Sequence, residues 1–318
     1  MKKNDKPLVS VIIISYKQAK YIREAIDSVL MQKVYFKYEL ILADDCSKDG
    51  TFEIMKEYEK KHSDVIKVLK REKNLGAHLN CSDAYSHAGG KYLTVLEGDD
   101  YWIDDNKLQM QVDFLEKNND FFAITHIQEG RNLNNEIKGY FPKPLKEDII
   151  ICGVEDFIKN GKDFSCSAIL YRNFYNDALK VKEISDLKKF DSLVGDAQSN
   201  IFFARQGKIY ISKKPMMVYR MRNNDGESNF NSSHKVNEIE YRYLNIYAKI
   251  EEYYDNQYCL FKMIKKCYTL GVAYNICTFN FKDIKNFNKI CPKKYKFRIW
   301  ISFPLTCISI LYRRFIIK

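Results

Sequence analysis

Residues 92–102 are Tyr92-Leu93-Thr94-Val95-Leu96-Glu97-Gly98-Asp99-Asp100-Tyr101-Trp102, a run of strand-forming residues that ends in acids and an aromatic pair. An apolar run of this length bounded by glycine is typical of a buried strand. Open α/β sheets bind their ligands at the carboxyl ends of the strands. Because two adjacent carboxylates repel each other, a divalent cation that also bridges phosphate oxygens is their simplest partner. A solvated acidic loop is the alternative.

Working outward, three more strand patterns precede this one, at residues 8–14, 38–43 and 65–69. The first is rich in β-branched residues, as buried parallel strands are. Helical spacing of apolar residues separates the strands. The alternation predicts a doubly wound, mostly parallel α/β sheet.

Beyond Trp102 the pattern is less regular. It predicts a helix over residues 107–115, strands at 121–125, 167–171 and 208–211, and loop-like chain over 128–148. A helix should open at Gly195-Asp196. We expect a catalytic domain over residues 1–235, with halves at 8–102 and 103–235, and a basic, helical C-terminal extension over 236–318.

Composition indicates a globular protein, with 46% hydrophobic and 29% charged residues. The net charge of +11 lies mostly in residues 282–318, which hold ten Lys or Arg and one Asp. Nine cysteines without a C-x-x-C pair predict reduced thiols in the cytoplasm. No signal-peptide pattern or apolar stretch of roughly 20 residues is apparent.

Three ordered motifs carry a family resemblance: residues 9–16 (VSVIIISY), 40–51 (LILADDCSKDGT) and 89–102 (GGKYLTVLEGDDYW). Together they resemble family 2 glycosyltransferases with a GT-A fold, over roughly residues 8–230. The resemblance implies a nucleotide-diphosphate sugar donor, probable UDP-sugar chemistry, and Mn²⁺ or Mg²⁺. It also implies inverting transfer to a glycan or lipid-linked acceptor in surface polysaccharide biosynthesis.

The resemblance assigns roles to individual residues. Ser15 and Tyr16 would lie on the nucleotide, with Tyr16 packed on the base and Asp45 accepting a hydrogen bond from the ring N–H. Asp100 would ligate the metal, and Asp99 would reach the ribose or the metal's water shell. The alternatives are a strand-end aromatic for Tyr16 and a helix N-cap for Asp45.

Asp196 resembles the family's general base, which takes the acceptor's proton. An ordinary helix N-cap is the alternative, and Asp191 is the second candidate for the base. Where many relatives have a metal-binding His, this chain has Arg222, which either clamps the diphosphate or is exposed. The Arg that often precedes Asn80 is replaced by Leu79.

His78, His87 and His126 are expected to be core or surface residues. The basic tail, 293–318, predicts contact with an anionic membrane surface. A helix packed on the catalytic domain is the alternative. No nucleic-acid module is recognisable.

The sequence predicts a cytoplasmic enzyme, peripheral on the inner face of the membrane if the tail binds lipid. A non-catalytic glycan- or nucleotide-sugar-binding protein on the same fold is one rival. A sugar-phosphate nucleotidyltransferase is the other, although residues 15–18 lack the Gly-rich loop of that class.

Overall fold

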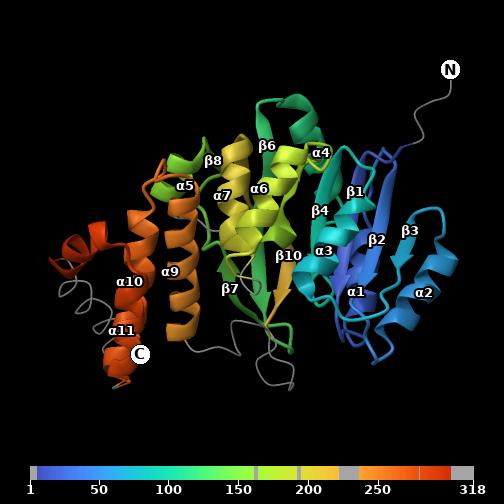
Figure 1. Ribbon diagram of the computed structural model, residues 1–318. Helices are drawn as coiled ribbons and strands as arrows, with labels where there is room; N and C mark the ends of the chain where they lie inside the picture. The colour runs from blue at the N-terminus through green and yellow to red at the C-terminus, as the bar shows by residue number, and fades with distance from the viewer. Residues whose placement is uncertain (1–5, 161–163, 192–194, 222–235, 279, 302–318) are drawn as a thin grey trace.

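The computed structural model describes residues 6–160, 164–191, 195–221, 236–278 and 280–301. The N-terminal elements lie at one end of the molecule and the C-terminal helices at the other (Figure 1). Strands β6 and β10 and helices α6 and α7 lie between them (Figure 1). One sheet, in the order β3-β2-β1-β4-β9-β6-β10-β5, connects the two ends.

The first half alternates strands and helices as the pattern predicted. Its strands β3, β2, β1 and β4 are mutually parallel. The β-branched side chains of β1 are buried on both faces of the sheet. On one face they pack with residues of α1 and α2, and on the other with residues of α3. The elements are β1 (Val9–Ser15), α1 (Ile22–Leu30), β2 (Tyr38–Asp44), α2 (Thr51–Lys61), β3 (Ile66–Leu69), α3 (Ala77–Ser86) and β4 (Tyr92–Glu97).

The second half extends the sheet with mixed strand directions. Strand β10 runs parallel to β6, whereas β5, β7, β8 and β9 pair antiparallel to their neighbours. The elements are β5 (Tyr101–Trp102), α4 (Lys107–Lys117), β6 (Phe121–Arg131), β7 (Ile137–Phe141), β8 (Ile149–Ile151), α5 (Val154–Asn160), η1 (Cys166–Ala168), β9 (Leu170–Arg172), α6 (Ala178–Lys188), α7 (Asp196–Gln206) and β10 (Lys208–Arg220).

The prediction of loop-like chain over residues 128–148 was wrong. Strand β6 continues to Arg131 and β7 pairs with it. The error has a physical cause: Gln128 and Glu129 are polar yet buried, and β7 is a largely exposed edge strand without an alternating apolar pattern. Helix α6 was also missed. The predicted strand at 208–211 is the start of β10, whose pairing with β6 shifts register around Pro215.

Within the described residues, the predicted helical character of the C-terminal extension is confirmed: it contains α9 (Val236–Tyr253), α10 (Phe261–Cys277) and α11 (Phe281–Ile290). These helices do not pack separately. Ile250 of α9 and Ile264 of α10 belong to one buried cluster with Phe157 of α5 and Phe202 of α7. The division at residue 235 stays a prediction about folding units, but the packing across it is continuous.

Candidate active site

The carboxyl ends of β1, β2 and β4 meet at one edge of the sheet. The register places Ser15 opposite Asp44 and Ile14 opposite Glu97. The acids that follow β2 and β4 therefore gather at this edge, as parallel pairing requires.

Arg220, at the end of β10, fixes the turn that carries Asp99 and Asp100. Its backbone N–H donates to Asp100 Oδ1 at 2.9 Å, and its Nε donates to the Asp99 carbonyl at 2.7 Å. Its Nη2 donates to Glu24 Oε2 at 2.6 Å. The guanidinium also lies 4.8 Å from the Tyr21 ring centre. Arg220 thus acts as a planar, multidentate support for the acidic turn.

The acidic turn is electrostatically unfavourable without a counter-charge. Burial, followed by repulsion from Asp99 and Glu97, holds the pKa of Asp100 well above its usual range, although Arg220 opposes this shift. A bound cation would reverse the shift by favouring the ionised carboxylate. The turn therefore fits a divalent metal by its charge.

The described residues contain no cluster of three or more His, Cys, Asp or Glu side chains that could hold a metal. A metal at Asp100 would therefore need further ligands from substrate phosphates, from water, or from residues beyond the described ranges. Mg²⁺ and similar hard ions are commonly held in this way, by one or two carboxylates and the substrate.

A cavity of about 440 Å³ joins the acidic turn to the start of α7. Glu97 and Asp100 line it from the sheet edge, while Asp191 and Asp196 line it from the second half. Asp196 is the first residue of α7, and its Oδ1 accepts a hydrogen bond from the Cys166 N–H at 3.2 Å. The carboxylate is thus oriented by one backbone donor at the cavity wall.

The second candidate for the base, Asp191, has a cationic partner. Its Oδ2 accepts a hydrogen bond from Arg242 Nη1 of α9 at 2.8 Å. This contact occupies one of its carboxylate oxygens and ties the side chain to α9. Asp196, whose carboxylate has no ion-pair partner among the residues that the structure describes, is the better placed of the two.

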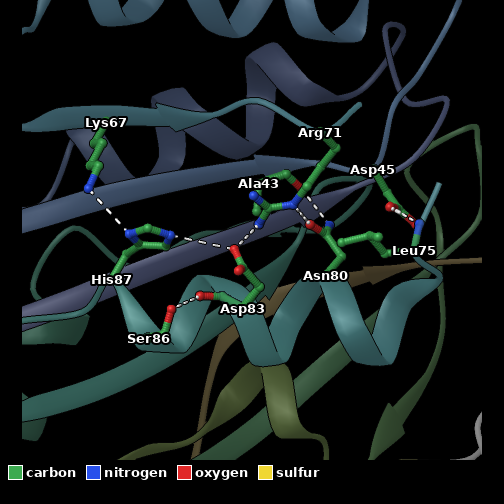
Figure 2. A network of polar contacts seen from close by, with 9 residues as sticks. All are labelled: Ala43, Asp45, Lys67, Arg71, Leu75, Asn80, Asp83, Ser86 and His87. Atoms are coloured by element: carbon green, nitrogen blue, oxygen red, sulfur yellow. Dashed lines mark hydrogen bonds and ion pairs between the residues drawn. The ribbon is translucent and has the colours of Figure 1, made fainter. Parts of the chain in front are cut away.

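The other predicted donor residues lie outside this cavity. Tyr16 is 45% exposed, and Ser15 is buried at the end of β1. Asp45 Oδ1 accepts from the Leu75 N–H at 2.7 Å (Figure 2). Its Oδ2 accepts from the Gly76 N–H at 2.8 Å. The cavity lining includes none of Ser15, Tyr16, Asp45 or Asp99, and Arg222 lies outside the described residues. Their assignment to the donor stays a prediction.

A polar network anchors α3, which forms one wall of the cavity. Arg71 Nε donates to Asn80 Oδ1 at 3.0 Å, and its Nη2 lies 2.7 Å from Asp83 Oδ2 (Figure 2). Asn80 Nδ2 in turn donates to the Ala43 carbonyl of β2 at 2.8 Å (Figure 2). The position before Asn80 is a leucine, and Arg71, from the loop after β3, contacts the asparagine instead.

The cavity wall also contains Glu97, Lys188 and His78, which the sequence analysis did not assign to the site and, for His78, expected in the core or on the surface. Glu97 is the first acid of the quoted stretch, so its position beside Asp100 was visible in the sequence. Lys188 ends a helix that the pattern did not reveal, and no motif marked His78.

The sequence model described as Glycosyl transferase family 2 matches residues 10–181, more than half of the chain. The chain therefore belongs to glycosyltransferase family 2.

Two relatives and one solved structure show the extent of the similarity. The Mycobacterium tuberculosis protein Rv1520 is 41% identical over 118 residues, 37% of this chain and 34% of its own. The Escherichia coli enzyme WfgD, named as a UDP-Glc:alpha-D-GlcNAc-diphosphoundecaprenol beta-1,3-glucosyltransferase, is 36% identical over 143 residues, 45% of this chain and 53% of its own. Each match thus spans only a third to about half of the relative's length.

The structure resembles that of S. aureus TarS in complex with UDP-GlcNAc, with a TM-score of 0.59 and 18% identity. The match covers 89% of this chain and 79% of that one. At this identity the likeness concerns the fold alone, and it confirms the GT-A prediction.

Proposed function

We propose that this chain transfers a sugar from a nucleotide-diphosphate donor, a UDP-sugar, to a hydroxyl of a glycan or lipid-linked acceptor in surface polysaccharide biosynthesis. The observation that carries the proposal is the single cavity lined by both Asp100 and Asp196. WfgD, whose name specifies a UDP-sugar and a diphosphoundecaprenol-linked acceptor, supports this choice of substrates.

The proposed reaction inverts the anomeric carbon. The acceptor oxygen forms a bond to that carbon while the bond to the nucleotide diphosphate breaks, and the diphosphate keeps the electron pair. Asp196 takes the proton of the attacking hydroxyl. Asp196 lines the same cavity as Asp100, which supports its action on an acceptor hydroxyl beside the donor.

Asp100, with Asp99 beside it, would hold Mn²⁺ or Mg²⁺. When bound, such an ion would neutralise the negative charge that develops on the leaving diphosphate. The chain's own contribution is rigidity, because Arg220 fixes both acids before a ligand arrives.

We also propose a cytoplasmic enzyme that binds the inner membrane surface peripherally. Residues 293–301 are helical; Tyr295 and Ile299 are buried in the core, whereas Phe297 is 79% exposed and Ile301 65% exposed. The helix thus packs on the domain and still presents apolar and basic side chains outward. Among the described residues, no helix is long and apolar enough to cross a bilayer, and residues 302–318 lie outside them.

A thermal-shift screen of UDP-, GDP- and CMP-sugars, with and without Mn²⁺, tests the donor site. Ligand that binds the native state raises Tm according to its concentration relative to Kd. We expect a Mn²⁺-dependent shift with one nucleotide class that Asp100→Ala abolishes and the exposed control Asp113→Ala retains. Absence of a shift with every nucleotide would refute the donor site.

Turnover distinguishes an enzyme from a non-catalytic binding protein on the same fold. Release of the nucleoside diphosphate should depend on added lipid-linked acceptor. Binding of a nucleotide sugar without release on any acceptor tested would favour the binding protein. Cosedimentation with anionic, but not zwitterionic, vesicles would support the membrane role, and failure with both would favour a helix that only packs on the domain.

A further inference from the structure

A lysine lines the cavity beside the proposed base. Lys188 is the last residue of α6, and its Nζ donates to the Gly195 carbonyl at 2.6 Å, one residue before Asp196. No carboxylate oxygen of the described residues lies within ion-pair distance of this ammonium group. A partly buried ammonium group that contacts only a neutral carbonyl lacks a counter-charge, so binding of an anionic ligand beside it is favourable.

The acids close to Lys188 in the chain have other partners, and Asp186, two residues before it, pairs with Lys182 and Lys189. Asp191 is paired with Arg242, and Asp196 is oriented by the Cys166 N–H. The positive charge of Lys188 therefore remains available to a ligand in the cavity.

A second polar group of the cavity wall is an unsatisfied histidine nitrogen. His78, in the first turn of α3, lines the same cavity, and its Nε2 is buried without a hydrogen-bond partner. Burial, and then the charge of Lys188, lower the pKa of this imidazole. His78 is therefore neutral near pH 7, and its ring can present one N–H to a ligand. A buried polar atom without a partner usually indicates a missing one.

We propose that Lys188 and His78 bind a carboxylate on the transferred sugar, so that the donor is a nucleotide-diphospho-hexuronic acid. The inference rests on the proposed function, because the sugar must lie between a diphosphate at Asp100 and the base at Asp196. Because Lys188 is hydrogen-bonded to Gly195, the residue before Asp196, it lies at the end of the cavity near the proposed base, where the sugar would bind. A carboxylate accepts bonds from both an ammonium and an imidazole N–H.

Isothermal titration without acceptor, in the presence of Mn²⁺, tests this with matched donors that differ only at C6. Suitable pairs are UDP-glucose with UDP-glucuronic acid, UDP-galactose with UDP-galacturonic acid, and GDP-mannose with GDP-mannuronic acid. We expect the acidic member of one pair to bind at least about tenfold more tightly, since a charge-assisted hydrogen bond contributes on that scale. Because acceptor is absent, a carboxylate on the acceptor cannot produce this result.

Three variants identify the residues responsible. Lys188→Gln keeps a donor for the Gly195 carbonyl but removes the charge, and should reduce the preference to about twofold or less without weakening the neutral donor. His78→Leu should reduce it partially. Lys182→Gln, on the exposed side of the same helix, is the control and should leave the ratio unchanged.

Equal or tighter binding of the neutral sugars in every pair would overturn the carboxylate proposal and leave the proposed function intact. A preference for the acidic sugar that survives both Lys188→Gln and His78→Leu would also overturn it. If no nucleotide sugar binds, the proposed function itself fails. Unchanged Tm in each variant shows that the fold is retained.

Discussion

The buried lysine at the start of α4 should make folding stability depend on pH. Lys107, the first residue of α4, is fully buried, and its Nζ donates to Gln111 Oε1 at 2.9 Å. The ammonium lies 4.1 Å from the Trp102 ring centre. Burial lowers the pKa of Lys107 to about 7.

The sign follows from proton binding. An unfolded lysine titrates at about 10.4, so between about pH 7 and 10 the unfolded chain binds a proton that the folded chain lacks. The free energy of unfolding therefore rises with pH in this window, by about 1.4 kcal/mol per pH unit. Lys107→Met removes this contribution. Its stability relative to the wild type should fall by about 2 kcal/mol between pH 7.5 and pH 9.

Urea unfolding followed by tryptophan fluorescence at the two pH values measures this difference. Lys117→Met, on the exposed side of the same helix, is the matched control and should shift little between them. If the difference in unfolding free energy between Lys107→Met and the wild type is the same at both pH values, the reasoning is wrong. The ammonium would then be charged in the fold, held by its cation–π contact with Trp102.

Other substitutions test the site and the elements that hold it. Asp196→Asn should lower turnover by about 10² to 10⁴-fold while donor binding is retained; lost binding would instead indicate a structural role. Arg71→Ala should destabilise the protein by about 2–3 kcal/mol in thermal or urea unfolding, whereas Arg23→Ala, which breaks an exposed ion pair, should change it by less than about 1 kcal/mol. Gly90→Ala would bring a Cβ within 2.5 Å of the Ser10 backbone nitrogen, so unfolding should show a loss of about 1–3 kcal/mol. Equal stabilities for Arg71→Ala and Arg23→Ala would contradict the role of the Arg71 network. A Gly90→Ala variant as stable as the wild type would contradict the close packing at Gly90.

The parallel half of the fold was predictable because its local signals agree. Five of the seven residues of β1 are Val or Ile, and β1, β2 and β4 end in polar residues at one edge of the sheet. The second half was harder to predict because burial there does not follow residue polarity. Glu129 is buried in β6 and forms an ion pair with Arg131, two residues further along the same face of the strand. A search for apolar residues cannot detect burial of this kind.

The same distinction applies to the candidate site. Asp100 and Asp196 could be proposed from the sequence because their motifs are local, and the fold brings them to one cavity. Lys188 and His78 come from different halves of the chain, so only the tertiary packing of α3 against the second half brings them into that cavity. For Asp45, the sequence could not distinguish a donor-binding residue from a helix N-cap. In the structure, its two carboxylate oxygens accept hydrogen bonds from the N–H groups of Leu75 and Gly76, which lead into α3.

The core shared by α9, α10 and α7 limits how this protein can be engineered or recombined. Helix α7 carries Asp196 at its start, and Arg242 of α9 contacts Asp191 in the same cavity wall. The C-terminal helices are thus not an interchangeable module. A chimera that took residues 236–301 from another transferase would lose the side chains that pack against α7 and the Arg242 contact to Asp191, so it would disturb the candidate site even with every motif of the first half intact.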